Sequence, residues 1–475
     1  MIPDRLRPVL EQTRPFAERF AGAGFRLYLV GGVVRDLLVG RELAADRDID
    51  LTTDARPEQI KQLVRDLADA VWTQGERFGT IGCKRGEWTF EITTHRAEAY
   101  TPDSRKPEVR FADVVETDLS RRDFTVNAMA LALPDPELID PFDGAGDLAA
   151  ARLRTPLSPE ESFADDPLRM LRAARFIAGY GLEPVPELTA AVRRMRHRLA
   201  IVSAERIRDE LDKLLVVPDP TAGLWFLVDT GLMEEFLPEV PAMRLEQDPI
   251  HRHKDVLTHT FAVVAKTSPR RIVRLAALFH DVGKPRTRSY GEHGVSFHHH
   301  EVVGARMTRQ RMRELRYANE DIEAVSRLVY LHLRFHTYKM GWTDSAVRRF
   351  VRDAGPLLDD LIELTRCDCT TRNERKARAL AARMDELEAR IAELAAKEEL
   401  ASIRPDLDGR EVMAHLGIGP GPLVGEALDH LLELRMEEGP LGREEALRRL
   451  DEWWAVRSAS GDAPADPTLG EEHDA

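Results

Sequence analysis

Two aspartates spaced two residues apart, Asp48 and Asp50, are the clearest chemical signal in this chain. The surrounding pattern, Asp-Ile-Asp-Leu, is typical of a β-strand, in which residues two apart point to the same face. Adjacent carboxylates repel one another unless a cation lies between them, and their hard oxygen atoms suit Mg²⁺. Because Mg²⁺ is usually shared between one or two carboxylates and substrate phosphates, the pair indicates a nucleotide substrate.

Two nearby motifs contain groups that bind phosphates and sugars. Gly31 and Gly32 follow a short apolar strand and begin a helix that carries Arg35, so backbone amides can approach a phosphate there. The charged segment from residue 121 to 127 offers guanidinium groups for phosphates, and Asp and Asn side chains for a ribose hydroxyl. Its candidate residues are Arg121, Arg122, Asp123 and Asn127. A surface salt-bridge cluster is the alternative interpretation of this segment.

Glu91 is an acidic residue on a strand otherwise made of aromatic and β-branched side chains, Trp88 to Thr93. Period-two alternation places it on the face opposite the aromatic residues. It is therefore either a third carboxylate beside Asp48 and Asp50 or a solvated edge residue, and the strand alone favours the second interpretation.

A helix that begins near residue 166 starts with acidic residues and a proline, as helix N-termini prefer. Arginines follow at intervals of three and form a stripe on one face. A stripe of this kind is more typical of a solvated helix face than of an RNA contact, and the same holds for a basic helix further on. The candidate residues are Asp165, Asp166, Arg169, Arg172, Arg175 and, on the later helix, Arg206.

Histidines become frequent from about residue 250 onward. A helix that ends in adjacent His and Asp followed by Gly delivers an imidazole and a carboxylate to one point, and further His and Asp residues at other helix ends can complete a divalent-metal site. A single buried His is more often a satisfied core residue, but six candidate ligands favour a metal. They are His259, His280, Asp281, His300, His332 and Asp368.

The elements that must position these residues change character along the chain. Strands and helices alternate as far as about residue 152, and helices dominate afterwards, so we expect an α+β protein whose small α/β head has a mixed sheet. An apolar stripe from Leu380 to Leu394 predicts either a coiled-coil dimer or docking within the chain, so the expected state is monomer or homodimer.

The amino-acid composition further narrows the class of protein to which this chain can belong. The net charge of −14 counts against nucleic-acid binding over the whole surface but leaves room for local basic patches. Three cysteines without framework spacing indicate a reducing compartment. No apolar run approaches roughly 18 residues, so we expect a cytoplasmic protein without membrane contact.

These motifs, in this order, resemble the class II tRNA nucleotidyltransferase and bacterial poly(A) polymerase family of the DNA polymerase β superfamily, with an HD domain attached. The resemblance implies a nucleotidyltransferase head at residues 1–152 and a helical neck for base and RNA binding at 153–245. It also implies an HD metal-binding domain at 246–370 and a helical tail that contacts tRNA at 371–457. Residues 458–475 are Pro-rich and acidic, and we expect them to be disordered.

The resemblance also assigns roles. It implies that Asp48 and Asp50 hold two Mg²⁺ ions, with Glu91 in the third carboxylate position, and that the arginine-rich segment surrounds ribose and triphosphate. Asp166 and Arg169, one helical turn apart, can offer an acceptor and a donor that complement cytosine and adenine but not uracil and guanine.

The expected activity is addition of C, C and A from CTP and ATP to the 3′ end of tRNA. Poly(A) synthesis and addition of only CC or only A are the alternatives within the family, and the short acidic tail favours CCA addition over poly(A) synthesis. The HD ligands imply a further divalent metal such as Mn²⁺, Ni²⁺ or Mg²⁺ and a second, phosphohydrolase activity on RNA ends or small phosphoesters. A non-catalytic RNA scaffold is the least favoured class because it has no need for paired aspartates.

Overall fold

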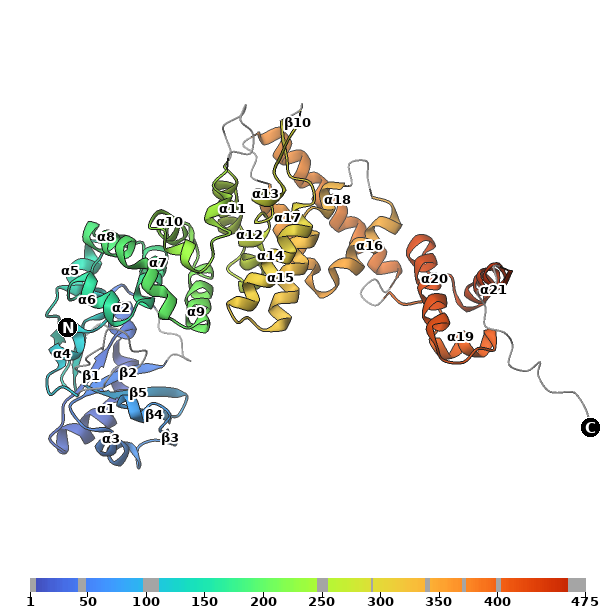
Figure 1. Ribbon diagram of the computed structural model, residues 1–475. Helices are drawn as coiled ribbons and strands as arrows, with labels where there is room; N and C mark the ends of the chain where they lie inside the picture. Colours follow the sequence, from blue (N-terminus) through green and yellow to red (C-terminus); the bar gives the residue numbers. More distant parts are fainter. Residues whose placement is uncertain are drawn as a thin grey trace, which may run out of the picture.

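The computed structural model describes residues 6–41, 48–96, 111–245, 255–291, 294–337, 342–369, 373–398 and 403–459. The head, the neck helices, the histidine-bearing helices and the tail follow one another along an arc (Figure 1). Within these ranges, no helix has the length and apolarity that crossing a membrane requires.

The head is built on a seven-stranded sheet with the order β3-β4-β5-β2-β1-β6-β7. β2 and β5 are parallel, and the other neighbouring strands are antiparallel, which confirms the expected mixed sheet. The strands are β1 (Leu27–Val30), β2 (Ile49–Thr53), β3 (Ala70–Trp72), β4 (Thr80–Arg85), β5 (Trp88–Thr94), β6 (Ala130–Leu133) and β7 (Leu138–Ile139).

Helices α1, α2 and α3 pack in the core on one face of this sheet, and the carboxylates lie on the other face together with α4. Ile49 and Leu51 of β2 are buried in the head core, as is Phe90 of β5, whose ring lies 4.9 Å from that of Phe16 on α1. The alternation along β2 therefore directs Asp50 away from the core. The head helices are α1 (Arg7–Gly22), α2 (Gly32–Leu38), α3 (Pro57–Val64), η2 (Glu76–Phe78), α4 (Val115–Ser120), η3 (Thr125–Asn127) and α5 (Gly144–Ala149).

The neck is helical apart from a two-stranded pair, and its α7 carries the arginine stripe. Ser158 caps α6 in a capping box with Glu161, and Pro159 occupies its first turn. The elements are β8 (Arg152–Leu153), α6 (Pro159–Asp165), α7 (Leu168–Tyr180), β9 (Glu183–Pro184), α8 (Pro186–Met195), η4 (Arg196–Ile201), α9 (Ala204–Leu215), α10 (Thr221–Asp229), η5 (Leu232–Glu235) and η6 (Pro241–Met243).

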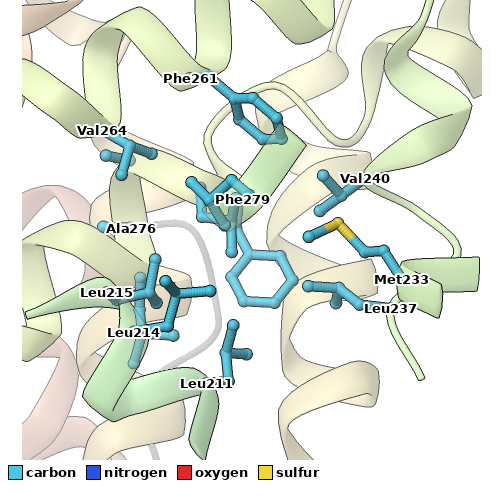
Figure 2. Close-up of a cluster of buried hydrophobic side chains, with 14 of the residues drawn as sticks. Leu211, Leu214, Leu215, Met233, Leu237, Val240, Phe261, Val264, Ala276 and Phe279 are labelled. Atoms are coloured by element: carbon cyan, nitrogen blue, oxygen red, sulfur yellow. The ribbon is translucent and has the colours of Figure 1, made fainter. Parts of the chain in front are cut away.

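The histidine-bearing region continues the neck without a break in its packing. Figure 2 shows Leu211 and Leu214 of α9 together with Phe279 of α12, and all three belong to one buried cluster that runs from the neck to α18. The elements of this region are α11 (Val256–Lys266), α12 (Arg271–Phe279), α13 (Lys284–Thr287), β10 (Ser289–Gly291), β11 (Gly294–Ser296), α14 (His300–Glu314), α15 (Asn319–Leu331), η7 (Arg334–Thr337), α16 (Asp344–Ala354), η8 (Gly355–Leu357) and α17 (Leu358–Asp368).

The apolar stripe of α18 (Glu374–Lys397) packs against other helices of the same chain, which is one of the two arrangements that the sequence predicts. Met384, Leu387 and Leu394 are buried in the cluster shared by the neck and the histidine-bearing region. The tail has a separate small core around Val412, Leu431 and Leu450. Its helices are α19 (Gly409–Leu416), α20 (Pro422–Glu438) and α21 (Arg443–Ala459). The disordered tail was expected from residue 458, but Ser458 and Ala459 belong to α21, and residues 460–475 lie outside the described residues.

Candidate active site and metal cluster

Asp50 and Glu91 face one another on the two parallel strands of the head. They are direct partners in the register of β2 and β5, and both line a cavity of about 410 Å³. Partial desolvation of Glu91 and the negative charges of Asp50 and Asp48 raise the pKa of the Glu91 carboxyl. Three carboxylates thus contribute to one negative field, and their hard oxygen atoms suit Mg²⁺.

The glycine turn lies against these carboxylates. Gly31 has φ = 73°, and a Cβ built on it would lie 3.0 Å from Arg122 Nη1 and 3.4 Å from Asp50 Oδ2. Only a residue without a side chain allows the backbone to come this close in this conformation. Gly32 follows as the first residue of α2.

The cavity is also lined by basic residues. Arg121, Arg122 and Arg169 line it together with the carboxylates. Arg122 pairs with Asp118 at 3.1 Å. Arg169 donates to Ser162 Oγ at 2.9 Å and to the carbonyl of Arg121 at 2.5 Å, so a neck residue is held at the edge of the head.

Asp166 lies at the junction of α6 and α7, directly after Asp165. Its Oδ1 accepts from the backbone amide of Leu168 at 3.1 Å, and its Oδ2 accepts from Arg206 at 2.7 Å. Asp166 and Arg169 are therefore held by different partners. Arg206, which the sequence offered as a further nucleotide-binding residue, is bonded to Asp166.

Several predicted nucleotide-binding residues form a buried network between the head and the neck. Asp123 accepts two bonds from Arg172, at 2.5 and 2.9 Å, and one from Asn127 at 2.9 Å. Burial raises the pKa of Asp123, but Arg172 and Asn127 outweigh burial and hold the pKa well below its ordinary value. Arg175 donates to the buried Glu210 at 2.9 Å. None of these residues lines the described cavity.

Arg35 is likewise in the interior. It is 4% exposed, it donates to Asp36 at 2.9 Å and to Asn127 at 2.5 Å, and it also donates to the hydroxyl of Tyr180. Its guanidinium carbon lies 4.2 Å from the centre of the Tyr180 ring. Arg35 thus joins α2 to the end of α7, and the cavity lining does not include it.

Four polar residues of the cavity lining were not predicted as site residues: Thr80, Thr93, Arg96 and Asp118. Arg96 donates to Thr80 Oγ1 at 2.8 Å, and its positive charge lowers the pKa of Glu91 against the other influences. Thr80 could in principle have been predicted from the sequence, because its strand, β4, directly precedes β5 along the chain. Arg96 lies beyond the end of β5, where strand periodicity no longer applies, and Asp118 has the pattern of a surface helix.

The predicted HD ligands gather into two adjacent groups. His259, His280 and Asp368 form one group, and Asp281, His300 and His332 form the other, with the ligand atoms of each group within 4.8 Å of one another. The ends of five helices supply them: α11, α12, α14, α15 and α17.

The donor set fits a divalent cation. The Nδ1 atoms of His280, His300 and His332 lie 2.6–2.7 Å from backbone carbonyl oxygens, so Nδ1 donates and each Nε2 is left for another partner. Nε2 of His300 and Nε2 of His332 are buried without a hydrogen-bond partner among the described residues. Each therefore offers an unused lone pair, as a metal ligand requires.

Charge in the cluster is consistent with this interpretation. Burial lowers the pKa of His332 to about 3, so this imidazole is neutral and able to coordinate. Burial also lowers the pKa of His280, but the carboxylates of Asp281 and Asp368 outweigh it and raise the pKa to about 10. A positive charge is thus favoured beside these carboxylates, and a divalent cation can replace the proton.

A mixed sheet with paired carboxylates on parallel strands, followed by helices that bear an HD ligand set, defines a metal-dependent nucleotidyltransferase with an appended HD domain. Family models agree: "Poly A polymerase head domain" matches residues 27–154, "Probable RNA and SrmB- binding site of polymerase A" matches 181–243, and "HD domain" matches 256–399. The chain belongs to the tRNA nucleotidyltransferase and poly(A) polymerase family, which confirms the resemblance.

Individual relatives differ in how much of the chain they match. An A-adding tRNA nucleotidyltransferase of Deinococcus radiodurans is 37% identical over 444 residues, which cover 90% of this chain and 95% of the relative. A CCA-adding enzyme of Lactobacillus gasseri is 37% identical over 244 residues, which cover 51% of this chain and 58% of the relative.

Solved structures show the same fold. The CCA-adding enzyme of Bacillus stearothermophilus in complex with CTP superposes with a TM-score of 0.69 at 23% identity, covering 97% of this chain and 100% of that chain. The Thermotoga maritima CCA-adding enzyme complexed with tRNA gives a TM-score of 0.58 at 19% identity, covering 96% of both chains.

Proposed function

We propose that the protein completes the 3′ end of tRNA by adding C, C and A from CTP and ATP. The observation that carries this proposal is the pairing of Asp50 with Glu91 in a cavity that arginines also line. Carboxylates suit Mg²⁺, and guanidinium groups suit the triphosphate. The names of the Deinococcus and Lactobacillus relatives support a tRNA 3′ end as acceptor.

The chain's own residues have distinct roles in the proposed transfer. When bound by Asp48, Asp50 and Glu91, Mg²⁺ supplies the Lewis acidity that favours ionisation of the RNA 3′-hydroxyl and neutralises the departing pyrophosphate. Gly31 lets the backbone approach the substrate beside Asp50. Arg121 and Arg122 stabilise the negative charge of the triphosphate.

We assign selection of the nucleotide base to two residues of the neck, Asp166 and Arg169. Cytosine and adenine both present an amino donor beside a ring-nitrogen acceptor, whereas uracil and guanine present the opposite order. Asp166 can only accept hydrogen bonds when it is ionised, and Arg169 can only donate them. We assign Arg206 to orienting the Asp166 carboxylate, because the two are bonded at 2.7 Å.

Addition of A alone is the second candidate, and one observation favours it. An A-adding enzyme matches 90% of this chain at 37% identity, whereas the sequence match to the Lactobacillus CCA-adding enzyme spans about half of this chain. The selection pair proposed here complements both C and A, so it is compatible with either activity.

An extension assay separates the candidates. Three purified tRNAs, ending at the discriminator base, after one C and after CC, are each incubated with CTP, with ATP and with both nucleotides. Complete CCA addition extends all three to the same end and stops there. Extension of only the CC-ended tRNA by a single A supports the second candidate, and a long A ladder or no extension contradicts both.

We also propose that the HD cluster binds Mn²⁺, Ni²⁺ or Mg²⁺ and hydrolyses phosphoesters, on the strength of the two unused Nε2 atoms. His300→Ala should reduce bound metal and abolish hydrolysis of 2′,3′-cyclic AMP while nucleotide addition survives. His299→Ala is the matched control because His299 is the exposed neighbour of His300. Equal metal content in the two variants would contradict the assignment.

We propose the domain limits 1–152, 153–245, 246–370 and 371–457 as functional divisions. A separate buried cluster supports the head as the first unit. The tail cluster covers only Leu407 to Leu450, and α18 packs in the cluster of the neck and the HD region. The neck and the HD region share one cluster, so their limit divides two functions within one packed body.

A further inference from the structure

A second and larger cavity lies in the HD region, outside both sites described above. It has a volume of about 850 Å³ and is lined by residues of α14, of α15 and of the turn between α16 and η8. A cavity of this size accommodates a small organic molecule. None of the six HD ligands and none of the catalytic cavity residues lines it.

The walls of this cavity expose large apolar side chains. Val302 of α14 is 47% exposed and Tyr330 of α15 is 40% exposed, and the smaller apolar residues Ala305 and Ala324 also line the cavity. Exposed apolar residues gathered in a concave surface indicate a ligand site more strongly than the same residues scattered on a convex surface. An aromatic side chain in the wall offers a stacking face to a planar ring.

A buried hydroxyl also lines the cavity. Ser326 is 1% exposed, and its Oγ has no hydrogen-bond partner among the described residues. Buried polar atoms are nearly always paired, so an unpaired hydroxyl at a cavity wall calls for a partner from outside the chain.

The rim carries spare positive charge. Arg306 and Arg352 form no ion pair or hydrogen bond with any described residue, whereas Arg309 pairs with Glu323 and Arg327 donates to the carbonyl of Asp353. Asp353 in turn pairs with Arg334. Glu320 is the remaining acidic residue of the rim, so two unpaired guanidinium groups face one unpaired carboxylate. Guanidinium groups bind phosphate in forked pairs.

We propose that this cavity binds a free nucleoside phosphate. Its base would lie against Tyr330 and Val302, its phosphate at Arg306 and Arg352, and a polar edge of the base at the Ser326 hydroxyl. Charge complementarity at the rim and the aromatic wall together favour this class over an uncharged apolar molecule. The site shares α14 and α15 with His300 and His332, so an occupant would contact two helices that hold HD ligands.

The test is equilibrium binding of AMP to the full-length protein in EDTA, which removes the divalent ions that support nucleotide binding in the head. Isothermal titration compares the wild type with a double variant, Arg306→Glu with Arg352→Glu. We expect the reversal of charge at two exposed positions to weaken AMP binding at least 10-fold. Arg313→Glu is the matched control, because Arg313 is an exposed arginine of α14 that does not line the cavity.

A second measurement locates the nucleotide directly. Photocrosslinking with 8-azido-AMP followed by peptide mapping should label the peptide that contains Tyr330, and the double variant should lose this label. Adenosine and inorganic phosphate serve as comparison probes, and each should bind more weakly than AMP because each lacks one of the two recognised groups. Equal AMP affinity in all variants, labelling confined to the head, or no binding at millimolar AMP would overturn the proposal. Nucleotide addition to tRNA should be unchanged in the double variant, so this test is independent of the proposed transferase activity.

Discussion

Glu91 is the residue whose role depends most on its neighbours. The proposed metal site predicts that Glu91→Gln lowers kcat by about 100-fold or more and raises the Mg²⁺ concentration needed for half-maximal rate, because a neutral amide is a poorer ligand than a carboxylate. Steady-state kinetics across a Mg²⁺ titration measure both effects. Glu87→Gln, which removes an exposed acidic residue in the turn before β5, should leave both parameters unchanged. An unchanged Mg²⁺ requirement in Glu91→Gln would show that Glu91 is not a ligand.

Asp123 gives a prediction about stability and pH. Its folded pKa is depressed, so its ion pair with Arg172 contributes stability that is fully present above the unfolded pKa of about 3.9 and is lost as pH falls towards the folded pKa. Asp123→Asn should therefore destabilise the protein by about 3–5 kcal/mol near neutral pH, with a smaller deficit below about pH 4. Thermal unfolding between pH 3 and pH 8 measures the difference. Asp113→Asn, at an exposed ion pair, should cost less than about 1 kcal/mol at every pH.

Residue types alone could predict some of these roles but not others. Period-two alternation is enough to place Asp50 opposite the core. It cannot show that β2 and β5 are neighbours, so Glu91 kept two interpretations until the register was known. Arginines such as Arg35 and Arg172 are typical phosphate ligands. The burial of Arg35 and the bonds of both residues depend on how the neck packs on the head, and no local sequence pattern encodes that packing.

Helix α7 is held at both ends, which sets the position of its arginines. Arg169 near its start donates to the carbonyl of Arg121, and Tyr180 at its end donates to Asp36 at 3.0 Å. The sequence predicted the start of this helix from its proline and acidic residues. The hydrogen bond at its end, between Tyr180 and Asp36, was not predictable, because it joins residues 144 positions apart.

Tyr180→Phe tests this fastening. Loss of the hydroxyl removes its bonds to Asp36 and Arg35, which we expect to lower stability by about 1–3 kcal/mol. Because α7 also carries Arg169, the KM values for CTP and ATP should rise together while kcat changes less. Tyr290→Phe is the control, since Tyr290 is 70% exposed. A loss of stability with unchanged KM values would show that the fastening does not position Arg169.

At the scale of the whole molecule, the neck and the HD region are joined by a buried cation. Arg274 is 1% exposed and donates to the carbonyl oxygens of Thr267, Leu215, Val217 and Pro218 at 2.5–3.1 Å. It thus satisfies the backbone at the end of α9 from a position on α12. The sequence predicts a domain boundary near residue 245 but not this link. Every residue has a backbone carbonyl, so residue types do not indicate which carbonyls a distant arginine will bond.

Arg274→Met should destabilise both regions together. It keeps much of the side-chain volume but leaves buried carbonyl groups without donors, at about 1–3 kcal/mol for each unsatisfied group. We expect at least about 3 kcal/mol in total, with faster amide hydrogen exchange in α9 as well as α12. Arg313→Met, at an exposed position, should change neither. Faster exchange confined to α12 would contradict the coupling.

The shared core has a consequence for how such chains can be recombined. Leu211 and Leu214 on one side and Phe279 on the other fit one another as parts of a single interior (Figure 2). A chimaera that joins the neck of one relative to the HD region of another would therefore bring together two surfaces that were never selected to match. The small tail core around Val412, Leu431 and Leu450 is separate from this interior, whereas the neck, the HD region and α18 must be inherited together. An exchanged head would also have to keep the bonds that Asp123 and Arg35 form with the neck.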